Sequence, residues 1–195
     1  MKAREFTLNL KKDEQEMPGV YIGDPCYILP DEFYHDFWGE THNFDDGAFS
    51  TEMPTGETRP VMIVAGTAYG DGIYQGEIIE RAGDKRNSYN YKRSLYDFGV
   101  DSGTLAVVNL EFADPDKIDK FRQSKSSGVI IEHPCAGMQL DEDDGFFHFT
   151  VLYKESGGET VEGCSVNIGT NDFYEDEDET EDDEYYDNEY YEDEN

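Results

Sequence analysis

The stretch that decides the fold is residues 60–79, which reads PVMIVAGTAYGDGIYQGEII. Residues 61–65 are a continuous apolar run of strand length, and Pro60 interrupts the chain just before it. The turn Gly70-Asp71-Gly72 then leads into a second apolar run, residues 73–79. This spacing is typical of a β-hairpin, so we expect residues 61–65 to form a central strand that pairs with residues 73–79.

Segments on both sides of this stretch also have the pattern of short strands between turn-forming residues. They are residues 6–10, 20–22, 105–110, 129–132, 146–153 and 161–168. The last two are expected to pair across the turn Ser156-Gly157-Gly158. Residues 41–59 are rich in Gly, Thr, Asp and Pro and indicate a loop, and residues 141–145 indicate a surface turn.

Two short helices are expected among these strands. Pro30-Asp31 opens an aromatic helix that ends at Trp38, and Asp114-Pro115 supplies a cap and a first helical residue for a helix over residues 115–123. Because strands outnumber helices, the sequence predicts an α+β fold with a mostly antiparallel, curved sheet and one or two packed helices. The pattern does not give the order of the strands.

Charge divides the chain into two parts. Residues 172–195 hold 15 acidic residues and no Lys or Arg, whereas residues 1–171 hold 31 acidic and 15 basic residues. From Tyr174 onward the acidic segment also lacks aliphatic side chains, so it cannot bury enough apolar surface to fold alone. We therefore expect one β-rich globular domain, residues 1–171, and a disordered polyacidic tail, residues 172–195.

The formal net charge of −31 excludes several classes of partner. It repels phosphate groups, so direct binding to nucleic acid or to an anionic membrane is not expected. No window has the roughly 20 apolar residues of a membrane helix, and the start of the chain lacks the apolar core of a signal peptide. Cys26, Cys135 and Cys164 are odd in number and widely spaced, which indicates reduced thiols. These features predict a cytoplasmic protein without a metal or other cofactor.

Three turns contain an aspartate, and they are Gly23-Asp24-Pro25, Gly70-Asp71-Gly72 and Asp101-Ser102-Gly103. If these turns meet at one end of a sheet, Asp24, Asp71 and Asp101 would gather carboxylates for a metal or for acid–base catalysis. His133 is a further candidate for such a site. The alternative is ordinary turn chemistry, which we favour because tight turns need Asp and Gly for their backbone geometry.

No familiar catalytic motif accompanies the turns. The four histidines do not have the spacing of a metalloprotease motif, and Ser102 does not lie in a GxSxG elbow. In His133-Pro134-Cys135 an imidazolium would stabilise a thiolate, but neighbours on a strand point to opposite faces, so a buried His and a buried Cys are the simpler interpretation. The pattern therefore favours a protein that is not an enzyme, without deciding the question.

Residues 84–93 place four of the 15 basic residues around two tyrosines, in an expected loop between two strands. Cations interleaved with aromatic rings suit stacking on bases and contact with phosphates. A solvated hairpin tip is the ordinary alternative. A third interpretation is that the acidic tail occupies this basic segment of its own chain.

Three motifs resemble those of small proteins of unknown function found in phages and bacteria. They are GDPCYIL at residues 23–29, GDGIY at 70–74 and GVDSGTL at 99–105, and the resemblance spans residues 20–108. The resemblance implies a similar small β-rich fold and a phage origin, which would place the protein in the host cytoplasm. It implies no particular activity, but a phage origin favours a protein that acts on host machinery.

The acidic tail supplies the leading hypothesis for function. Closely spaced carboxylates imitate a run of phosphates, and tyrosine rings offer flat surfaces that a basic, aromatic-lined groove can bind. We therefore expect an acidic binding or inhibitory module that mimics nucleic acid and occupies a basic site on a host or partner protein. Its candidate partner-binding residues are Glu175, Asp176, Glu177, Asp178, Glu179, Glu181, Asp182, Asp183, Glu184, Tyr185, Tyr186, Tyr190 and Tyr191.

Two alternatives from other classes remain open. The first is a small enzyme or ligand-binding domain that uses the turn aspartates, in which the tail only aids solubility. The second is a structural or assembly protein of a phage particle.

Overall fold

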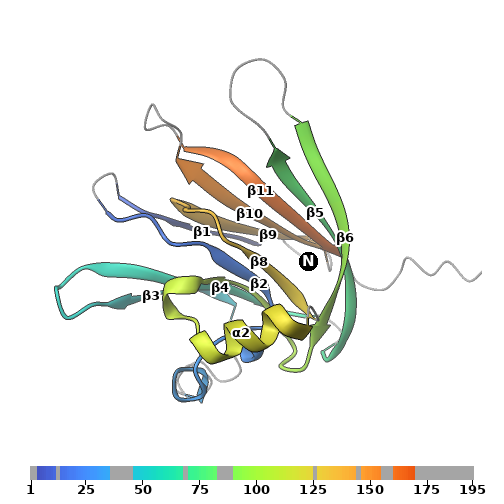
Figure 1. Ribbon diagram of the computed structural model, residues 1–195, viewed down its shortest axis with the longest axis horizontal. Helices are drawn as coiled ribbons and strands as arrows, with labels where there is room; N and C mark the ends of the chain where they lie inside the picture. Colours follow the sequence, from blue (N-terminus) through green and yellow to red (C-terminus); the bar gives the residue numbers. More distant parts are fainter. Residues whose placement is uncertain are drawn as a thin grey trace, which may run out of the picture.

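The computed structural model describes residues 4–11, 14–35, 46–67, 70–82, 90–124, 127–143, 146–154 and 160–169. Within these ranges the chain forms eleven strands in two antiparallel sheets, with few helices (Figure 1). The α+β class expected from the sequence is therefore confirmed. The strands are divided between two sheets, whereas a single curved sheet was expected.

The first sheet has six strands in the order β1-β9-β10-β11-β5-β6. The strands β9, β10 and β11 pair in chain order, β5 pairs with β6, and β11 joins the two groups by pairing with β5. Strand β1 pairs with β9 and forms the far edge. The bounds are Arg4–Asn9 (β1), Gly137–Asp143 (β9), Phe146–Lys154 (β10), Thr160–Gly169 (β11), Gly72–Ala82 (β5) and Asn90–Val100 (β6).

The second sheet has five strands in the order β3-β4-β7-β2-β8. Strand β7 is buried at every residue, and β4 is buried over most of its length. Runs of apolar residues without polar alternation are typical of strands that are covered on both faces. The bounds are Gly47–Glu52 (β3), Thr58–Gly66 (β4), Thr104–Asn109 (β7), Val20–Gly23 (β2) and Gly128–Ile131 (β8).

The five-stranded sheet is the middle of three layers. Alternate residues of β4 and β7 contribute to two different cores, because successive side chains on a strand point to opposite faces. Ile63 and Val107 pack in the core between the two sheets, together with Phe149 of β10. Met62 and Val108 pack in a second core, which α2 (Pro115–Ser124) covers. Figure 1 shows α2 on the side of this sheet that faces away from β9, β10 and β11.

The 3-10 helices η1 (Pro25–Tyr27) and η2 (Leu110–Phe112) lie next to the second core, which they reach from the ends of β2 and β7. Residues 31–35 are helical, as expected for the aromatic segment, and residues 36–38 of that expected helix lie outside the described ranges. No helix in the described part of the chain has the length and apolar character needed to cross a membrane.

Several expectations about individual segments are wrong. Residues 61–65 and 73–79 do not form a hairpin, because β4 and β5 belong to different sheets and β5 pairs with β6 and β11. Residues 41–59, expected to be a loop, contain β3 and the start of β4. Residues 141–143 are the end of β9 rather than a surface turn.

The other expected strands, the β10–β11 hairpin and helix α2 are confirmed. Strands β6 and β9, which are rich in polar residues, were not expected as strands.

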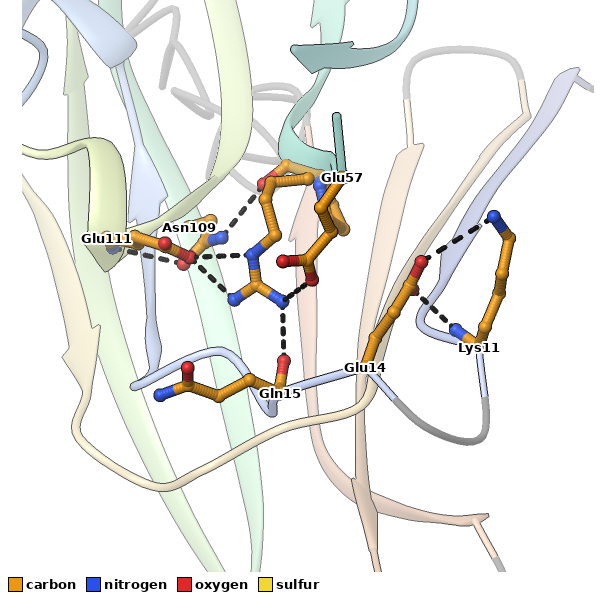
Figure 2. Close-up of polar contacts among 8 residues, drawn as sticks. Lys11, Glu14, Gln15, Glu57, Asn109 and Glu111 are labelled. Carbon is orange, nitrogen blue, oxygen red and sulfur yellow. Dashed lines mark hydrogen bonds and ion pairs between the residues drawn. The ribbon is translucent and has the colours of Figure 1, made fainter. Parts of the chain in front are cut away.

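A buried arginine connects three separate segments at the margin of the second sheet. Arg59 of β4 is 3% exposed. Its guanidinium donates to Glu111 Oε2 from Nε at 3.0 Å and from Nη2 at 2.6 Å, and Nη1 donates to the carbonyl oxygen of Gln15 at 2.6 Å. A longer contact of 3.4 Å reaches Glu57. Figure 2 shows Gln15, Glu57 and Glu111 converging on this point.

Asn109 fixes the carboxylate side of this network. Its side chain donates to the carbonyl oxygen of Pro60 at 2.8 Å and accepts from the N–H of Glu111 at 3.0 Å (Figure 2). The start of η2 is therefore held against β4. Because Arg59 is bound to a backbone carbonyl and a carboxylate in a buried position, its charge is compensated inside the protein.

We predict that Arg59→Ala lowers the free energy of unfolding by about 3 kcal/mol, because it removes a buried guanidinium together with the three hydrogen bonds by which it joins Gln15 and Glu111 to β4. Urea unfolding monitored by circular dichroism measures this change. Glu57→Gln is the matched control, since the Glu57 side chain is 40% exposed and its contact is long, and it should cost less than about 1 kcal/mol. Equal losses in the two variants would contradict the assignment.

Candidate functional site

The turns that contain Asp24 and Asp101 meet at one end of the sheets. Gly23, the last residue of β2, pairs with Ala106 near the start of β7. This register places Asp24, which directly follows β2, beside residues 101–103, which lead from β6 into β7. The sequence hypothesis of converging aspartate turns requires such an arrangement.

The turn that contains Asp71 lies at the same place. The backbone N–H of Thr67 donates to the carbonyl oxygen of Gly103 at 2.8 Å, and its hydroxyl donates to the carbonyl oxygens of Gly70 at 2.7 Å and Gly103 at 3.0 Å. A Cβ atom at Gly103 would lie 3.9 Å from Asp71 Oδ1. The chain passes between the two sheets twice here, before β5 and before β7, and these contacts fasten the two passages to each other.

The carboxylate of Asp24 is completely buried and accepts four hydrogen bonds. Oδ1 accepts from the N–H of Cys26 at 2.8 Å and from the hydroxyl of Ser102 at 2.8 Å. Oδ2 accepts from the N–H groups of Asp101 and Ser102, each at 2.7 Å. A carboxylate has about four lone-pair sites, so both oxygens are saturated. Asp24 is therefore a structural latch between the turn after β2 and the turn before β7.

This latch leaves Asp24 without an oxygen for a metal ion or a substrate proton. Within the described ranges, no group of three or more His, Cys, Asp or Glu side chains is arranged to hold a metal ion. Asp71 and Asp101 are exposed, so they are the two aspartates of the set that solvent reaches.

The hydroxyls of the two tyrosines around the latch, Tyr27 and Tyr34, keep their protons and are not bases. The hydroxyl of Tyr27 donates to Asp101 Oδ2 at 2.5 Å, and burial together with this bond raises the pKa of Tyr27. Burial and the proximity of Cys26 and Asp24 raise the pKa of Tyr34 to about 12. Both side chains are therefore neutral at physiological pH.

A cavity of about 280 Å³ lies between the turn after β2 and α2. Lys117 crosses its margin, where Nζ donates to the carbonyl oxygen of Cys26 at 3.2 Å and to Asp31 Oδ1 at 2.6 Å. Burial and the nearby Asp24 carboxylate raise the pKa of the Cys26 thiol, which is therefore not a thiolate nucleophile. The cavity is lined by Cys26, Tyr27, Lys117, Lys120, Phe121, Ser124 and Ser127.

His133 does not lie with the aspartates. Strand β8 is antiparallel to β2, so Gly128 faces Gly23 while Ile131 faces Val20. His133 follows Ile131 and therefore lies toward the end of β2 opposite to Asp24. Its ring stacks on Tyr153 with 3.9 Å between centroids. A site made of the three turn aspartates does not include His133.

Cys135 is also unsuited to nucleophilic chemistry. It is fully buried, and its backbone forms a two-way bridge with Met17. Burial, with a smaller effect of Glu16, raises the pKa of the Cys135 thiol to about 12. The side chain of His133 is exposed, in contrast to the buried His expected from the sequence. None of the three cysteines, all of which lie in the described part of the chain, forms a disulfide.

The acidic tail lies outside the described residues, as do Lys85 and Arg86 of the basic segment. All of residues 84–89 lie outside the described ranges, and residues 90–93 belong to β6 rather than to the expected loop. The candidate partner-binding residues of the tail therefore stay a prediction from the sequence.

Three large apolar side chains on the outward face of the six-stranded sheet are exposed and were not expected from the sequence. Leu95 is 84% exposed, Ile73 is 61% exposed and Phe146 is 55% exposed. Leu95 lies in β6, which was not recognised as a strand. The alternation of Tyr96, Phe98 and Val100 along β6 was the signal that would have identified it.

Comparison of the chain with protein-family models, curated proteins and solved structures finds no match. The kinship with phage and bacterial proteins suggested by the three motifs therefore stays a prediction.

We predict that Asp24→Asn lowers the free energy of unfolding by about 3 kcal/mol, because the amide NH₂ group confronts donors where an acceptor is required. Asp101→Asn is the control, since it keeps an oxygen for the hydroxyl of Tyr27, and it should cost less than about 1 kcal/mol. Urea unfolding measures both. The latch is refuted if Asp24→Asn unfolds at the same urea concentration as the unaltered protein.

We predict that native Cys135 reacts with iodoacetamide at pH 8 at least about a hundredfold more slowly than in the urea-unfolded chain. Its pKa rises from an ordinary 9.0 to about 12 on folding. The neutral thiol therefore stabilises the fold below pH 9, and this contribution is lost as the pH rises toward 12. Mass spectrometry of the labelled peptide measures the rate. A fast native reaction that His133→Ala abolishes would instead support an imidazole–thiolate pair.

Proposed function

We propose that this protein is an acidic binding module that occupies a basic site on a partner protein. The observation that carries the proposal is the charge distribution. The chain has 46 acidic and 15 basic residues, and residues 172–195 alone hold 15 acids and no base. Charge is the property in which this chain departs most from ordinary composition.

The chemistry of the tail matches a site that binds nucleic acid. Its consecutive carboxylates are spaced closely enough to imitate phosphates for Lys and Arg side chains. Five tyrosines, Tyr174, Tyr185, Tyr186, Tyr190 and Tyr191, offer rings to the aromatic side chains that line such grooves. The partner is therefore a basic protein that handles nucleic acid, and neither nucleic acid nor a membrane is bound directly.

The folded body also carries an excess of negative charge, with 31 acidic and 15 basic residues in residues 1–171. In the part of the body that the structure describes, six basic residues form ion pairs with acidic residues of the same chain, so their positive charge is compensated locally. These residues are Arg4, Lys11, Arg59, Arg93, Lys117 and Arg122. A partner that approaches the body therefore meets a surplus of carboxylates as well as the tail.

A catalytic site on the turn aspartates is the less well supported candidate. The turns meet, as that candidate requires, but the carboxylate that lies deepest is saturated by four donors. The two remaining carboxylates are exposed to solvent, and within the described ranges neither forms a hydrogen bond or ion pair with a histidine that would act as a base.

We predict that the intact chain captures a basic protein from a bacterial lysate and that a chain ending at Phe173 does not. Binding should weaken about tenfold or more between about 50 mM and 200 mM salt, because the contact is electrostatic. Duplex DNA should compete with it. Captured proteins are identified by mass spectrometry, and the affinity of the purified pair is then measured by titration at both salt concentrations.

A full-length variant in which the five tail tyrosines are replaced by serine serves as the matched control. It keeps every tail charge, so a selective loss of affinity in this variant isolates the contribution of the rings. Capture by the intact and the shortened chain alike, or binding that is insensitive to salt and to DNA, would refute the tail as the mimic.

A further inference from the structure

The outward face of the six-stranded sheet contains a hollow. Antiparallel partners share a face, so the register aligns Phe146 of β10, Gly169 of β11 and Gln75 of β5 in one row. Gly169 has no side chain, which leaves a gap between Phe146 and Gln75. The gap is part of a groove of about 410 Å³.

Leu95 forms the opposite wall of this hollow. The next row across the sheet contains Asn167 of β11, Glu77 of β5 and Leu95 of β6. Leu95 and Phe146 both line the groove and are both largely exposed. Large apolar side chains in such positions mark interaction sites when polar residues surround them, as they do here.

The surroundings of the hollow are acidic. Glu77 lies in its wall, Asp97 is paired with Gln75 beside it, and Asp141 lies farther along the same row as Glu77 through its pairing with His148. Among the described residues of this face, Arg93 contacts Glu77 at 3.4 Å. An acidic rim disfavours a second copy of this chain and its own acidic tail, and it favours a positively charged occupant.

The position of the hollow in the chain connects it with the tail. Gly169, which lines the groove, is the last residue of β11, and the acidic segment begins three residues later at Asp172. A partner seated in the hollow therefore meets the tail at high effective concentration, because the two are joined by a very short stretch of chain.

We propose that this hollow is the docking site for the basic partner: it takes one apolar side chain from a lysine- or arginine-rich segment, while the acidic residues at its rim bind the flanking cations. This inference rests on the proposed function. It adds a folded surface by which the protein can select among basic partners. Charge attracts many basic proteins, whereas the hollow selects those that present an apolar side chain between their cations.

The test uses two fluorescein-labelled peptides, one with a single leucine flanked by lysines and one in which serine replaces that leucine. Fluorescence anisotropy with the full chain should show about fivefold tighter binding of the leucine peptide, because it buries an apolar side chain. Leu95→Ser and Phe146→Ser should each remove that preference and leave the serine peptide unchanged. The backbone amide signals of Gly76 and Gly169 should shift only with the leucine peptide.

Ile73→Ser is the matched control, because Ile73 is exposed on a neighbouring part of the same face and does not line the groove. It should keep the preference for leucine. Equal affinities for the two peptides, or a preference that survives Leu95→Ser, would overturn the docking site. Leucine-peptide binding that strengthens when residues 174–195 are removed would overturn it in favour of the tail as occupant. A dimer that Leu95→Ser dissolves would overturn it in favour of a second copy.

The two proposals fail in different ways. If removing residues 174–195 leaves the affinity for both peptides unchanged while Leu95→Ser still removes the preference for leucine, the tail hypothesis fails and the docking site stands. If the removal weakens both peptides equally and the Leu95 and Phe146 variants change nothing, the tail hypothesis stands and the docking site fails.

Discussion

The arrangement of the two sheets depends on one buried carboxylate. Asp24 accepts hydrogen bonds from residues 77 and 78 positions later in the chain, in the turn where the chain passes from the six-stranded to the five-stranded sheet. A buried carboxylate costs several kcal/mol of solvation unless donors replace the water, and four donors do so here. The latch therefore forms only when both turns are in their native positions, and it fixes them to each other.

The need to compensate charge also explains how so acidic a chain folds. Carboxylates repel one another, and the described body reduces this repulsion by placing its bases where they compensate acids, with Arg59 inside the protein and others on the surface. The uncompensated acids remain outside. The carboxylates of the latch and of the Arg59 network are hydrogen-bonded within the fold, whereas Asp97 and Asp141 beside the hollow are exposed. Under the proposed function, folding and partner recognition therefore use different carboxylates.

The fold class, most strands and helix α2 could be predicted because apolar runs and turn residues are local signals. The pairing of β4 could not, since its partner in the sheet, β7, lies beyond the intervening β5 and β6. The convergence of the aspartate turns was predictable as a possibility, but the sequence cannot show that Asp24 is saturated, because its donors come from a distant turn. The hollow could not be predicted, because it depends on the strand register that places Gly169, which has no side chain, between Phe146 and Gln75.

The pairing of Gly66 with Thr104 means that the chain leaves the five-stranded sheet and returns to it at opposite residues of one ladder. In topological terms, β5 and β6 are an insertion into a β4–β7 hairpin. Its entry and exit are fastened together, so a change of length where β5 connects to β6, in residues 83–89, is isolated from the five-stranded sheet. The length of the β5–β6 connection can therefore change while the strands of the five-stranded sheet, which α2 covers, keep their register.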